Sequence, residues 1–478
     1  MERILTSKQM READAFTIEK LGVPSEVLVE RAGEAVAKEI ITKFRGGRVL
    51  VCCGKGNNGA DGKIVAQKLS TVHGFSVSIM NVDNGILKLF DRKFDIIVDC
   101  IFGTGLSRII DGKTKKIIEK INESDAYVVS CDIPSGINGD TGEIMGVAVK
   151  ANLTVAIGEY KLGHFLNSGI DYSGKVVLKD IGISVWDDGV AKRFCKEDVA
   201  LFFPKRERNV HKGSFGKAGV IGGSRAFTGS ILLSANALSS LKMGAGYSYI
   251  GVPKTMFKDY LGLNPECILT LLNDDDGNII FDEDTLSPFL KLDSIAIGIG
   301  IGVSEEIYKI ISYLLTNFKG TLIIDADGLN TIAKYGINVL KQKSCKVILT
   351  PHVGEFARLT NINKDEIMSD IINKVKVFSS DFDVVTVLKN AVSIISDGKD
   401  VYINTTGTSG LAKAGSGDVL SGLIAGVTAR NTDAFGSAVA SCFIFGRAGE
   451  LATKKQNEYT VTASDVINNL PDAIDYLY

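Results

Sequence analysis

Several features that would assign a protein class at once are missing from this chain of 478 residues. Its 8 cysteines form no C-x-x-C pair and have no paired histidines nearby, which argues against a zinc site. The formal net charge is -2 and neither end carries a basic tail, so the charge pattern of a nucleic-acid-binding protein is absent. No apolar run approaches the ~18 residues of a membrane span, and charged residues follow the first methionine directly, unlike a secretory signal. We therefore expect a cytoplasmic protein that binds neither nucleic acid nor membranes.

Proline is scarce and glycine is abundant, with 8 prolines against 51 glycines. This excess predicts many tight turns between strands and helices, where the backbone can approach a ligand closely. The side chains are 45% hydrophobic and 23% charged, which excludes wholesale disorder. At roughly 100–200 residues per domain, the length predicts two to four domains.

Continuous apolar strands alternate with helices in two series, as in parallel sheets covered on both faces. The first series includes Arg48–Cys53 and the second begins at Lys217–Gly222. The stretch from about 186 to 212 interrupts the alternation, and its acidic, glycine and proline residues predict a solvated connection. We therefore predict one α/β domain over residues 1–205 and another over residues 206–478.

Three local patterns give more detailed expectations. Thr6 and Gln9 have the spacing of a capping box at the start of a helix. A helix is expected over Ser230–Lys242, and a single final helix over Ala463–Leu477.

The first glycine-rich cluster, Gly54–Gly62, lies between a strand and a helix. Such a turn can hold an anion on its amide groups and on the helix dipole. The cluster satisfies G-x-G-x-x-G, and Asp83 ends the next strand about where a ribose-binding acid would lie. A Rossmann dehydrogenase is therefore one interpretation. However, Asn57, Asn58 and Asp61 supply more amide and carboxylate groups than a phosphate turn needs, which favours a site that also binds a cation or a sugar.

Two further strands end in an acidic residue followed by a glycine turn, at Asp99 and at Asp132. A carboxylate in that position is costly unless it is paired or bound to a cation. The two acids could share a monovalent ion, or one could have its pKa adjusted for proton transfer. Either acid alone could instead cap the next helix, but together they favour a catalytic pocket.

The second series places other polar groups at strand ends. The sequence Gly298-Ile299-Gly300-Ile301-Gly302 would give a wall without side chains for a flat ligand. Asp325 and Asp327 would suit Mg²⁺ or its water shell. His352 follows another strand; a lone histidine is more often structural, but its position at the same edge favours contact with a ligand.

The most specific cluster is Gly415-Ser416-Gly417-Asp418 at the start of a helix. The glycine turn and the first helical N–H groups form an anion hole, and Asp418 lies in the first turn. A base beside such a hole can take a proton from a hydroxyl that attacks a phosphoryl group. Ser416 could simply be an N-cap, but the flanking glycines and the preceding Lys389 favour a nucleotide site.

These motifs resemble two known families in one chain. The first half resembles the NAD(P)H-hydrate epimerase (YjeF N-terminal) family, and the second is similar to the ADP-dependent NAD(P)H-hydrate dehydratases of the ribokinase-like superfamily. The motifs of the first half are Arg31-Ala32-Gly33, Gly56–Gly62, Asp99 with Phe102–Leu106, Asp132–Gly136 and Lys161–His164. Those of the second half are His211–Gly213, Asp325–Asp327, Thr350–His352, Leu388-Lys389 and Gly415–Asp418.

The resemblance implies a Rossmann-like three-layer sandwich followed by a ribokinase-like three-layer sandwich. It further implies epimerisation of the R and S forms of hydrated NADH and NADPH (NADHX and NADPHX) by the first domain. The second domain would dehydrate the S form with ADP as co-substrate, giving AMP and phosphate. K⁺ would serve the first domain and Mg²⁺ the second, and we expect a homo-oligomer.

The resemblance also implies residue roles. Asp132 would be the acid/base of epimerisation and Asp418 the base of dehydration, and both would also contact substrate. The other implied contacts with the hydrate in the first domain are Asn57, Asn58, Gly59, Ala60, Asp61, Gly103, Thr104, Gly105, Leu106, Ser107, Arg108 and Ile109. Its implied K⁺ ligands are Asn58, Asp99 and Ser135. In the second domain the implied hydrate contacts are Ser230, Gly302 and His352, and the implied nucleotide contacts are Lys389, Asn390, Ala391, Val392, Ser393 and Gly417.

Three positions depart from the family patterns. Ala60 replaces a glycine, and Ile299 and Val353 replace prolines. Ala60 would narrow the first pocket if its φ had to be positive. Two other functions stay open: a ribokinase-like small-molecule kinase fused to a nucleotide-binding Rossmann-like module, and a first domain that only binds nucleotides or partners as a scaffold.

Overall fold

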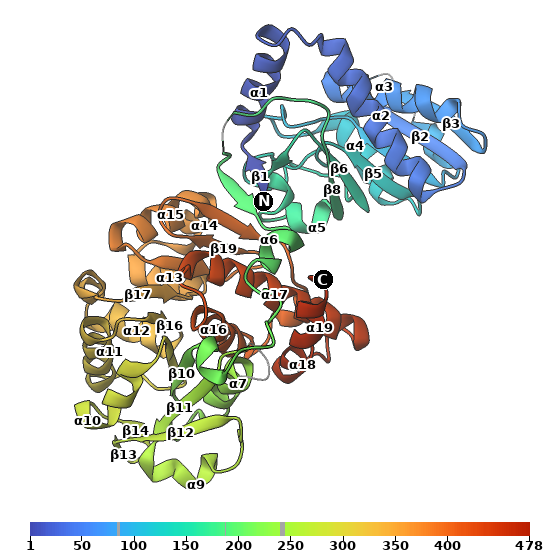
Figure 1. Ribbon diagram of the computed structural model, residues 1–478. Helices are drawn as coiled ribbons and strands as arrows, with labels where there is room; N and C mark the ends of the chain where they lie inside the picture. Colours follow the sequence, from blue (N-terminus) through green and yellow to red (C-terminus); the bar gives the residue numbers. More distant parts are fainter. Residues whose placement is uncertain (84–86, 187, 240–243) are drawn as a thin grey trace. The chain divides into compact units, whose positions relative to one another are not determined.

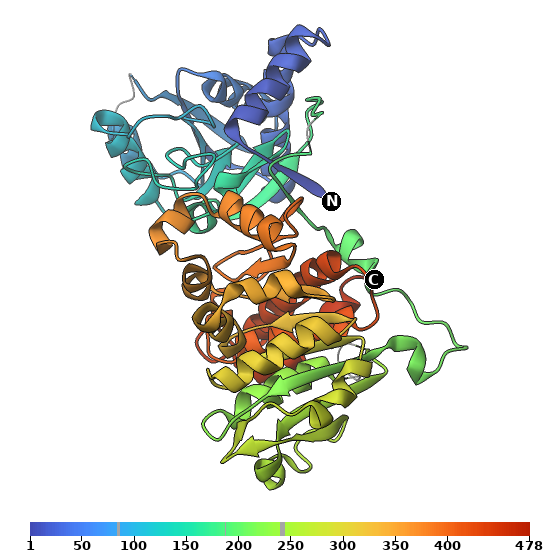
Figure 2. The same cartoon turned by 90° about the vertical axis from the view of Figure 1, so that its left-hand side faces the viewer.

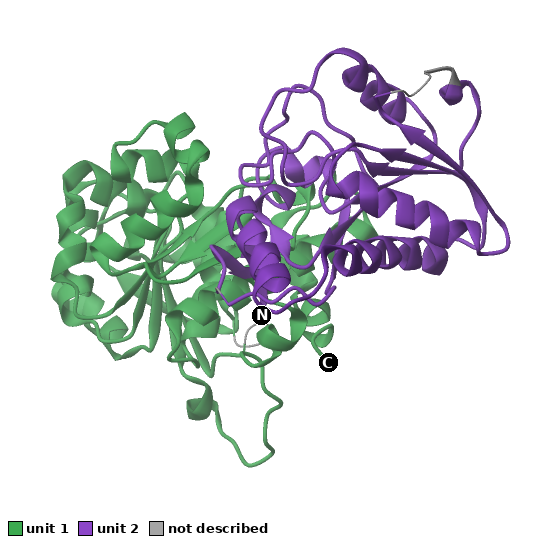
Figure 3. Ribbon diagram, turned by 90° about the horizontal axis from the view of Figure 1, so that it is seen from above, with its two compact units in different colours: residues 1, 193–478 green, residues 2–192 purple. Residues whose placement is uncertain are grey.

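Each of the two series of apolar strands forms a mainly parallel sheet. The computed structural model describes residues 1–83, 87–186, 188–239 and 244–478. One compact unit comprises residues 2–192, and the other comprises Met1 and residues 193–478 (Figure 3). The end of the helix expected over 230–242, and Asp187 of the expected connection, lie outside the described residues.

In the unit of residues 2–192 the strand order is β3-β2-β4-β5-β6-β8, and all pairings between these strands are parallel. The strands are β2 (Gly47–Cys53), β3 (Phe75–Asn81), β4 (Ile96–Cys100), β5 (Tyr127–Cys131), β6 (Leu153–Ile157) and β8 (Lys175–Lys179). The helices are α1 (Ser7–Glu19), α2 (Ser25–Lys43), α3 (Asn57–Ser70), α4 (Gly112–Asn122) and α5 (Gly169–Tyr172), and a short parallel pair joins β1 (Glu2–Leu5) to β7 (Tyr160–Lys161). The capping box expected at the start of α1 is confirmed, with reciprocal hydrogen bonds between Thr6 and Gln9.

Helices cover both faces of this sheet because successive strand residues point to opposite sides. Val51 of β2 packs with Val36 of α2 and Leu69 of α3. Leu50, its neighbour in the chain, packs on the other side with Ile117 of α4. The strand order reverses at β2, which has β3 on one side and β4 on the other. In an open parallel sheet, ligands bind at the carboxyl ends of the strands beside such a reversal.

The sheet of the unit of residues 193–478 runs in the order β12-β11-β10-β15-β16-β17-β18-β19-β20. The pairings from β12 to β18 are parallel, and those of β18 with β19 and of β19 with β20 are antiparallel. The strands are β10 (Lys217–Gly222), β11 (Tyr247–Pro253), β12 (Cys267–Leu272), β15 (Ser294–Ile299), β16 (Thr321–Ile324), β17 (Lys346–Leu349), β18 (Val385–Leu388), β19 (Ser393–Ser396) and β20 (Val401–Asn404). Here the order reverses at β10, so the corresponding ligand position lies between β10 and β15.

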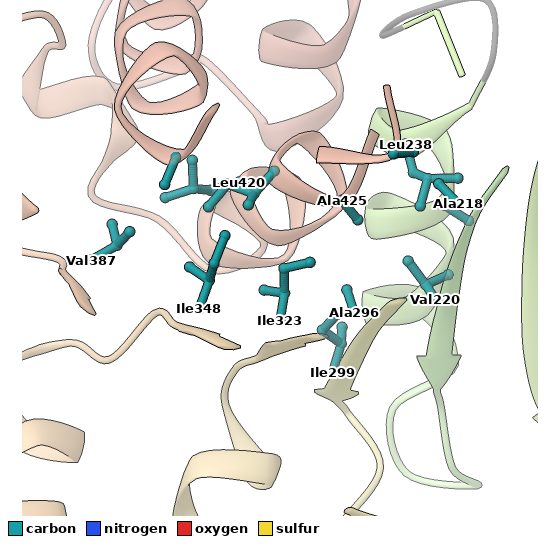
Figure 4. Close-up of a cluster of buried hydrophobic side chains, with 14 of the residues drawn as sticks. Ala218, Val220, Leu238, Ala296, Ile299, Ile323, Ile348, Val387, Leu420 and Ala425 are labelled. Carbon is teal, nitrogen blue, oxygen red and sulfur yellow. The ribbon is translucent and has the colours of Figure 1, made fainter. Parts of the chain in front are cut away.

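Two layers of helices cover this second sheet. The core of one side joins α7 (Thr228–Leu238), α16 (Ser416–Thr428) and α17 (Ala434–Lys455) to the strands, with Leu420 packed near Ile323 and Ile348 (Figure 4). The helices α11 (Glu305–Asn317) and α12 (Asp327–Tyr335) lie on the other side, at the left of the sheet in Figure 1 and toward the viewer in Figure 2. The remaining segments are β9 (Ala191–Arg193), α6 (Lys196–Ala200), α9 (Phe257–Tyr260), β13 (Asp274–Asp275), β14 (Asn278–Ile279), α10 (Glu283–Leu286), α13 (Val353–Thr360), α14 (Lys364–Ser369), α15 (Ile371–Phe382), α18 (Ala463–Asn468) and α19 (Leu470–Asp475).

Two expectations differ from the structure. The expected connection over 186–212 is partly structured, because Val199 and Phe203 are buried in the same hydrophobic cluster as α16 and α17. The units accordingly divide at 192/193, whereas the sequence predicted 205/206. The final helix is two helices that meet at Asn469, because Pro471 lacks the N–H that a continuous helix requires. No helix in the described part of the chain has the length and apolar character to cross a bilayer.

Candidate active sites

A cavity of about 790 Å³ lies within the unit of residues 2–192, at the carboxyl ends of β2 and β4. The start of α3 and the loop after β4 form one part of the cavity wall. Side chains of α1 and α2 form another part of it. Gly56 and Gly105 both line it, and apart from their chain neighbours no described atom comes within 4 Å of where a Cβ would stand on either. A ligand can therefore approach the bare backbone at both glycines.

The start of α3 is held by close packing of its backbone on the turn before it. A Cβ on Gly59 would stand 1.9 Å from the carbonyl oxygen of Gly54. Ala60, which replaces a family glycine, is a helical residue of α3 outside the cavity lining and has no positive φ. Alanine is therefore accommodated at position 60 without backbone strain.

Gly59→Ala is expected to destabilise the unit of residues 2–192 by about 1–3 kcal/mol, because an overpacked site must shift its backbone. The fluorescence of Trp186, the single tryptophan of the chain, would follow urea unfolding of this unit. Gly56→Ala is the matched control, since Gly56 has an ordinary φ of -84° and open space around it. Equal stability of the two variants would contradict the packing argument.

Beneath the cavity, Asp99 is fully buried in a network of hydrogen bonds. Its carboxylate accepts bonds from Ser130 Oγ (2.8 Å), Ser135 N (2.8 Å) and Ser135 Oγ (2.5 Å). Burial nevertheless raises the pKa of Asp99, because removal from water penalises the charged form. Asn58 of α3 is also buried, and neither polar atom of its amide has a hydrogen-bond partner in the described structure.

The donor set of this buried cluster fits a monovalent cation. Asn58, Asp99 and Ser135 offer amide, carboxylate and hydroxyl oxygens, the ligand type that hard cations take. An unpartnered buried amide is costly, and an ion beside it would satisfy its oxygen. No group of three or more His, Cys, Asp or Glu side chains in the described chain is arranged for a metal.

Asp132 follows β5 in a left-handed backbone conformation, with φ 66°. Its Oδ1 accepts hydrogen bonds from the ammonium of Lys161 and from the N–H of Ile157 (3.2 Å). Lys161 is only 1% exposed and also donates to Ile157 O at 2.6 Å. The second oxygen, Asp132 Oδ2, faces the loop after β4, 3.7 Å from where a Cβ on Gly103 would stand. One carboxylate oxygen is thus fixed by the protein while the other is directed toward the cavity.

His164 holds the main chain at Asp132. Its Nδ1 accepts the N–H of Lys161 (3.1 Å), so its Nε2 carries the proton and donates to Asp132 O (2.7 Å). Burial and the charge of Lys161 lower the pKa of His164 to about 4. The ring is therefore neutral at physiological pH and supports the unusual φ of Asp132.

The depressed pKa of His164 predicts a loss of stability in mild acid. Between its unfolded value of about 6.5 and its folded value of about 4, the unfolded chain binds a proton that the folded chain does not. His164 therefore favours folding above pH 6.5 and loses that contribution as the pH falls toward 4. In urea unfolding followed by Trp186 fluorescence, the stability difference between wild type and His164→Gln should shrink by about 2 kcal/mol from pH 7 to pH 5. A pH-independent difference would contradict a neutral buried His164.

Two more carboxyls line the same cavity. Asp61 lies on α3 and Asp14 on α1. Burial, and then the negative charges of Asp132 and Asp14, raise the pKa of Asp61 to about 8. Burial raises the pKa of Asp14 to about 6, with a smaller raising effect from Asp132 and a lowering one from Lys161. Around neutral pH, Asp61 therefore keeps its proton.

In the unit of residues 193–478, Asp325 links the predicted polar clusters. Its Oδ1 lies 2.7 Å from Lys389 Nζ, and its Oδ2 accepts Ser421 Oγ at 2.6 Å. Lys389 Nζ would be 3.2 Å from a Cβ on Gly417. The lysine after β18 thus reaches the first turn of α16, where a positive charge and free N–H groups favour phosphate.

Asp418 lies in that first turn, which begins after Gly415 at φ 89°. Burial and then the charge of Asp325 raise the pKa of Asp418 to about 6, although a hydrogen bond with Ser230 and the charge of Lys389 act in the opposite direction. A carboxylate with this pKa is mostly ionised at neutral pH and can accept a proton. The predicted pair Ser230 and Asp418 is therefore in contact.

Other predicted residues lie around this group. The N–H of Gly302 donates to Asp327 Oδ2 (2.9 Å), and His352 forms a β-bridge with Lys389. Asn390 and Ala391 are exposed in the turn between β18 and β19. Asp325 is committed to Lys389 and Ser421, so of the two acids suggested for Mg²⁺ only Asp327 has the freedom to face an ion.

Comparison with known proteins covers both units. The family model described as YjeF-related protein N-terminus matches residues 25–89 and 81–163, and the model described as NAD(P)H-hydrate dehydratase matches residues 218–472. The bifunctional NAD(P)H-hydrate repair enzyme Nnr of Thermofilum pendens is 33% identical over 99% of this chain and 96% of its own length. The enzyme of that name from Coxiella burnetii is 30% identical over 98% of this chain and 99% of its own.

The chain belongs to the family of bifunctional NAD(P)H-hydrate repair enzymes.

A solved structure supports the fold of the second half of this repair enzyme. ADP/ATP-dependent NAD(P)H-hydrate dehydratase from Bacillus subtilis, co-crystallised with ATP and Mg²⁺, is 26% identical to this chain. The match covers 60% of this chain and 99% of the other, with a TM-score of 0.52. The predicted fold class is confirmed: both units are α/β sandwiches, and the second is ribokinase-like.

The structure brings most predicted site residues of the epimerase-type unit to one cavity. Those that line it are Asn57, Asn58, Asp61, Gly103, Thr104, Gly105, Leu106, Ser107, Arg108 and Asp132. Gly59, Ala60 and Ile109 lie outside the lining, Gly59 because it packs on Gly54 and Ile109 because it is 71% exposed. Asp83, the acid that suggested a dehydrogenase, also lines the cavity.

Sequence reasoning gave no role to three residues that hold or surround Asp132, namely Lys161, His164 and Asp14. The sequence does contain a signal for Lys161, which follows an apolar strand closely and precedes Leu162 and Gly163. A lysine in such a buried run needs a carboxylate partner. For Asp14 there was no signal, since an acid on an amphipathic helix is usually solvated.

Proposed function

We propose that this chain repairs hydrated nicotinamide coenzymes in two reactions at two separate sites. The main support is that each unit has one aspartate at the edge of its sheet where ligands bind. This residue is Asp132 in the first unit and Asp418 in the second. The first site would interconvert the R and S forms of NADHX and NADPHX. The second would dehydrate the S form with ADP, giving AMP and phosphate.

In the first unit, the hydrated nicotinamide would lie in the cavity between the start of α3 and Asp132. The hydroxyl is carried by the carbon next to a ring nitrogen, whose lone pair can expel it as water once it is protonated. Asp132 can hold that proton at Oδ2 because Lys161 and Ile157 fix its other oxygen. Asn58, Asp99 and Ser135 would hold K⁺, which would supply a positive charge to offset that of the buried Asp99.

In the second unit, Asp418 would deprotonate the hydroxyl of the hydrate while Ser230 orients the carboxylate. Lys389 and the N–H groups at Gly417 would stabilise the negative charge of the transferred phosphoryl group. Phosphate, unlike hydroxide, is then a good leaving group, and its loss restores NAD(P)H. Asp327, whose Oδ2 accepts the N–H of Gly302, would help to hold Mg²⁺ beside the nucleotide phosphates, and the ion would offset their negative charge.

The test supplies the purified chain with both epimers, K⁺, Mg²⁺ and either ADP or ATP, and follows the absorbance of reduced nicotinamide. We expect absorbance to return for both epimers, with stoichiometric release of AMP and phosphate when ADP is used. Omission of the nucleotide should abolish the return and leave epimerisation intact. Accumulation of a stable phosphorylated sugar or vitamin alcohol, without recovered NAD(P)H, would instead identify a small-molecule kinase.

A further inference from the structure

We infer that Asp61 is a second catalytic carboxyl of the epimerase-type site, which exchanges a proton with the hydroxyl on one face of the hydrated ring while Asp132 serves the other face. This inference rests on the proposed epimerase function and deepens it. It assigns to Asp61 proton transfer in addition to substrate contact.

Asp61 is buried, but its carboxyl makes no stabilising interaction in the described structure. It is 9% exposed, it lines the cavity, and none of the described hydrogen bonds or ion pairs involves its side chain. Asp99, the other buried acid of this edge, by contrast accepts hydrogen bonds from Ser130 Oγ and from the N–H and hydroxyl of Ser135. Burial of an unpartnered carboxyl is costly, so a role in the cavity accounts for Asp61 where a role in folding does not.

Asp61 and Asp132 reach the cavity from different elements. Asp61 extends from α3, whereas Asp132 follows β5 and is fixed by Lys161. Because Lys161 and the N–H of Ile157 hold Oδ1, the carboxylate of Asp132 cannot move across the cavity. A fixed carboxyl can serve one face of a bound ring, and inversion requires that the hydroxyl leaves one face and returns to the other.

The charges that surround the two carboxyls also differ. Burial and the charges of Asp132 and Asp14 raise the pKa of Asp61 to about 8. Asp132 instead has the positive charge of Lys161 against it. Pairs of titratable groups in contrasting environments are typical of an acid working with a base.

The proposed step balances in both directions. The proton of the Asp61 carboxyl passes to the departing hydroxyl, the C–O bond breaks, and the ring nitrogen's electron pair forms an N=C bond with release of water. Water then adds to the opposite face, its proton passes to Asp132, and the electron pair returns to nitrogen. The enzyme is left with Asp132 protonated and Asp61 ionised. This form either converts the other epimer in reverse or exchanges its proton with solvent.

The test measures inversion and oxygen exchange separately in H₂¹⁸O, using the full chain with K⁺ and without nucleotide. For Asp61→Asn we expect inversion to fall by about 10²–10⁴-fold. Exchange of ¹⁸O with retention should persist in the epimer whose hydroxyl faces Asp132. Asp61→Glu, which keeps a carboxyl, should recover part of the inversion. Asp125→Asn is the matched control, because Asp125 is exposed and lies before β5, at the opposite edge of the sheet.

Each other outcome is informative. Inversion by Asp61→Asn at the wild-type kcat, with or without a raised KM, would overturn the second-carboxyl role and leave Asp61 as a binding residue. Equal loss of exchange in both epimers, in a variant with wild-type Trp186 fluorescence, would also overturn it. If the wild type itself does not invert either epimer, the proposed epimerase function fails. If Asp61→Asn does not fold, inversion at the wild-type rate by Asp61→Ser would overturn the inference.

Discussion

Asp418→Asn is expected to lower nucleotide-dependent dehydration by about 10²–10⁴-fold, while epimerisation continues at the wild-type rate. The asparagine keeps the shape of the side chain and its contact with Ser230 but cannot accept the proton of the hydroxyl. The Asp325–Lys389 pair at 2.7 Å is untouched, so nucleotide binding should be retained. The return of reduced-nicotinamide absorbance with ADP measures the loss, and separation of the two epimers by chromatography measures the activity that remains.

The matched control is Asp381→Asn, because Asp381 is an exposed residue of α15. It should dehydrate at the wild-type rate. Full dehydration by Asp418→Asn would remove Asp418 from the reaction, and loss of both activities in a folded Asp418→Asn would contradict separate sites.

Asp132→Asn is expected to have the opposite effect, with epimerisation lowered by about 10²–10⁴-fold and dehydration of the S epimer unchanged. The amide oxygen can still accept the bond from Lys161, and His164 still holds the backbone carbonyl. The fold around φ 66° should therefore persist, while the proton that Asp132 exchanges is lost. The measurement is the rate at which a pure epimer reaches the equilibrium mixture.

A double variant, Asp132→Asn with Lys161→Met, separates chemistry from stability. A buried ammonium that lacks a carboxylate is destabilising, and its removal should restore the unfolding transition without restoring epimerisation. Unchanged epimer exchange in Asp132→Asn would support the alternative in which the first unit only binds a nucleotide or a partner.

Much of the fold was predictable because it depends on local pattern. Strands such as β2 and β10 are continuous apolar runs, and only a sheet covered on both faces buries such runs completely. The glycine turns after these strands, at Gly54 and Gly223, indicate the edge of each sheet at which ligands bind. The connection after residue 186 was harder, because the hydrophobic run from Val199 to Phe203 is short and has charged residues on both sides. Their burial depends on helices more than 200 residues later in the chain.

In the candidate sites, too, some residues could be predicted from the sequence and others could not. Asp132 and Asp418 are recognisable in the sequence because each stands beside glycines at a strand or helix end, where a buried acid needs a reason. The sequence does not show which residues pair with each other across the fold. Ser421 and Lys389 converge on Asp325 from two elements.

The sequence by itself determined the two α/β units, the family to which the chain belongs, and the strand ends at which its acids lie. Local hydrophobic periodicity and glycine-rich motifs are enough for those conclusions. Only the tertiary structure decided that Lys161 and His164 hold Asp132, that the buried amide of Asn58 has no partner among the described residues, and that Asp61 and Asp14 share one cavity with Asp132. These features depend on which side chains are removed from water and which charges lie close together in the folded chain. The order of residues in the sequence does not give those distances.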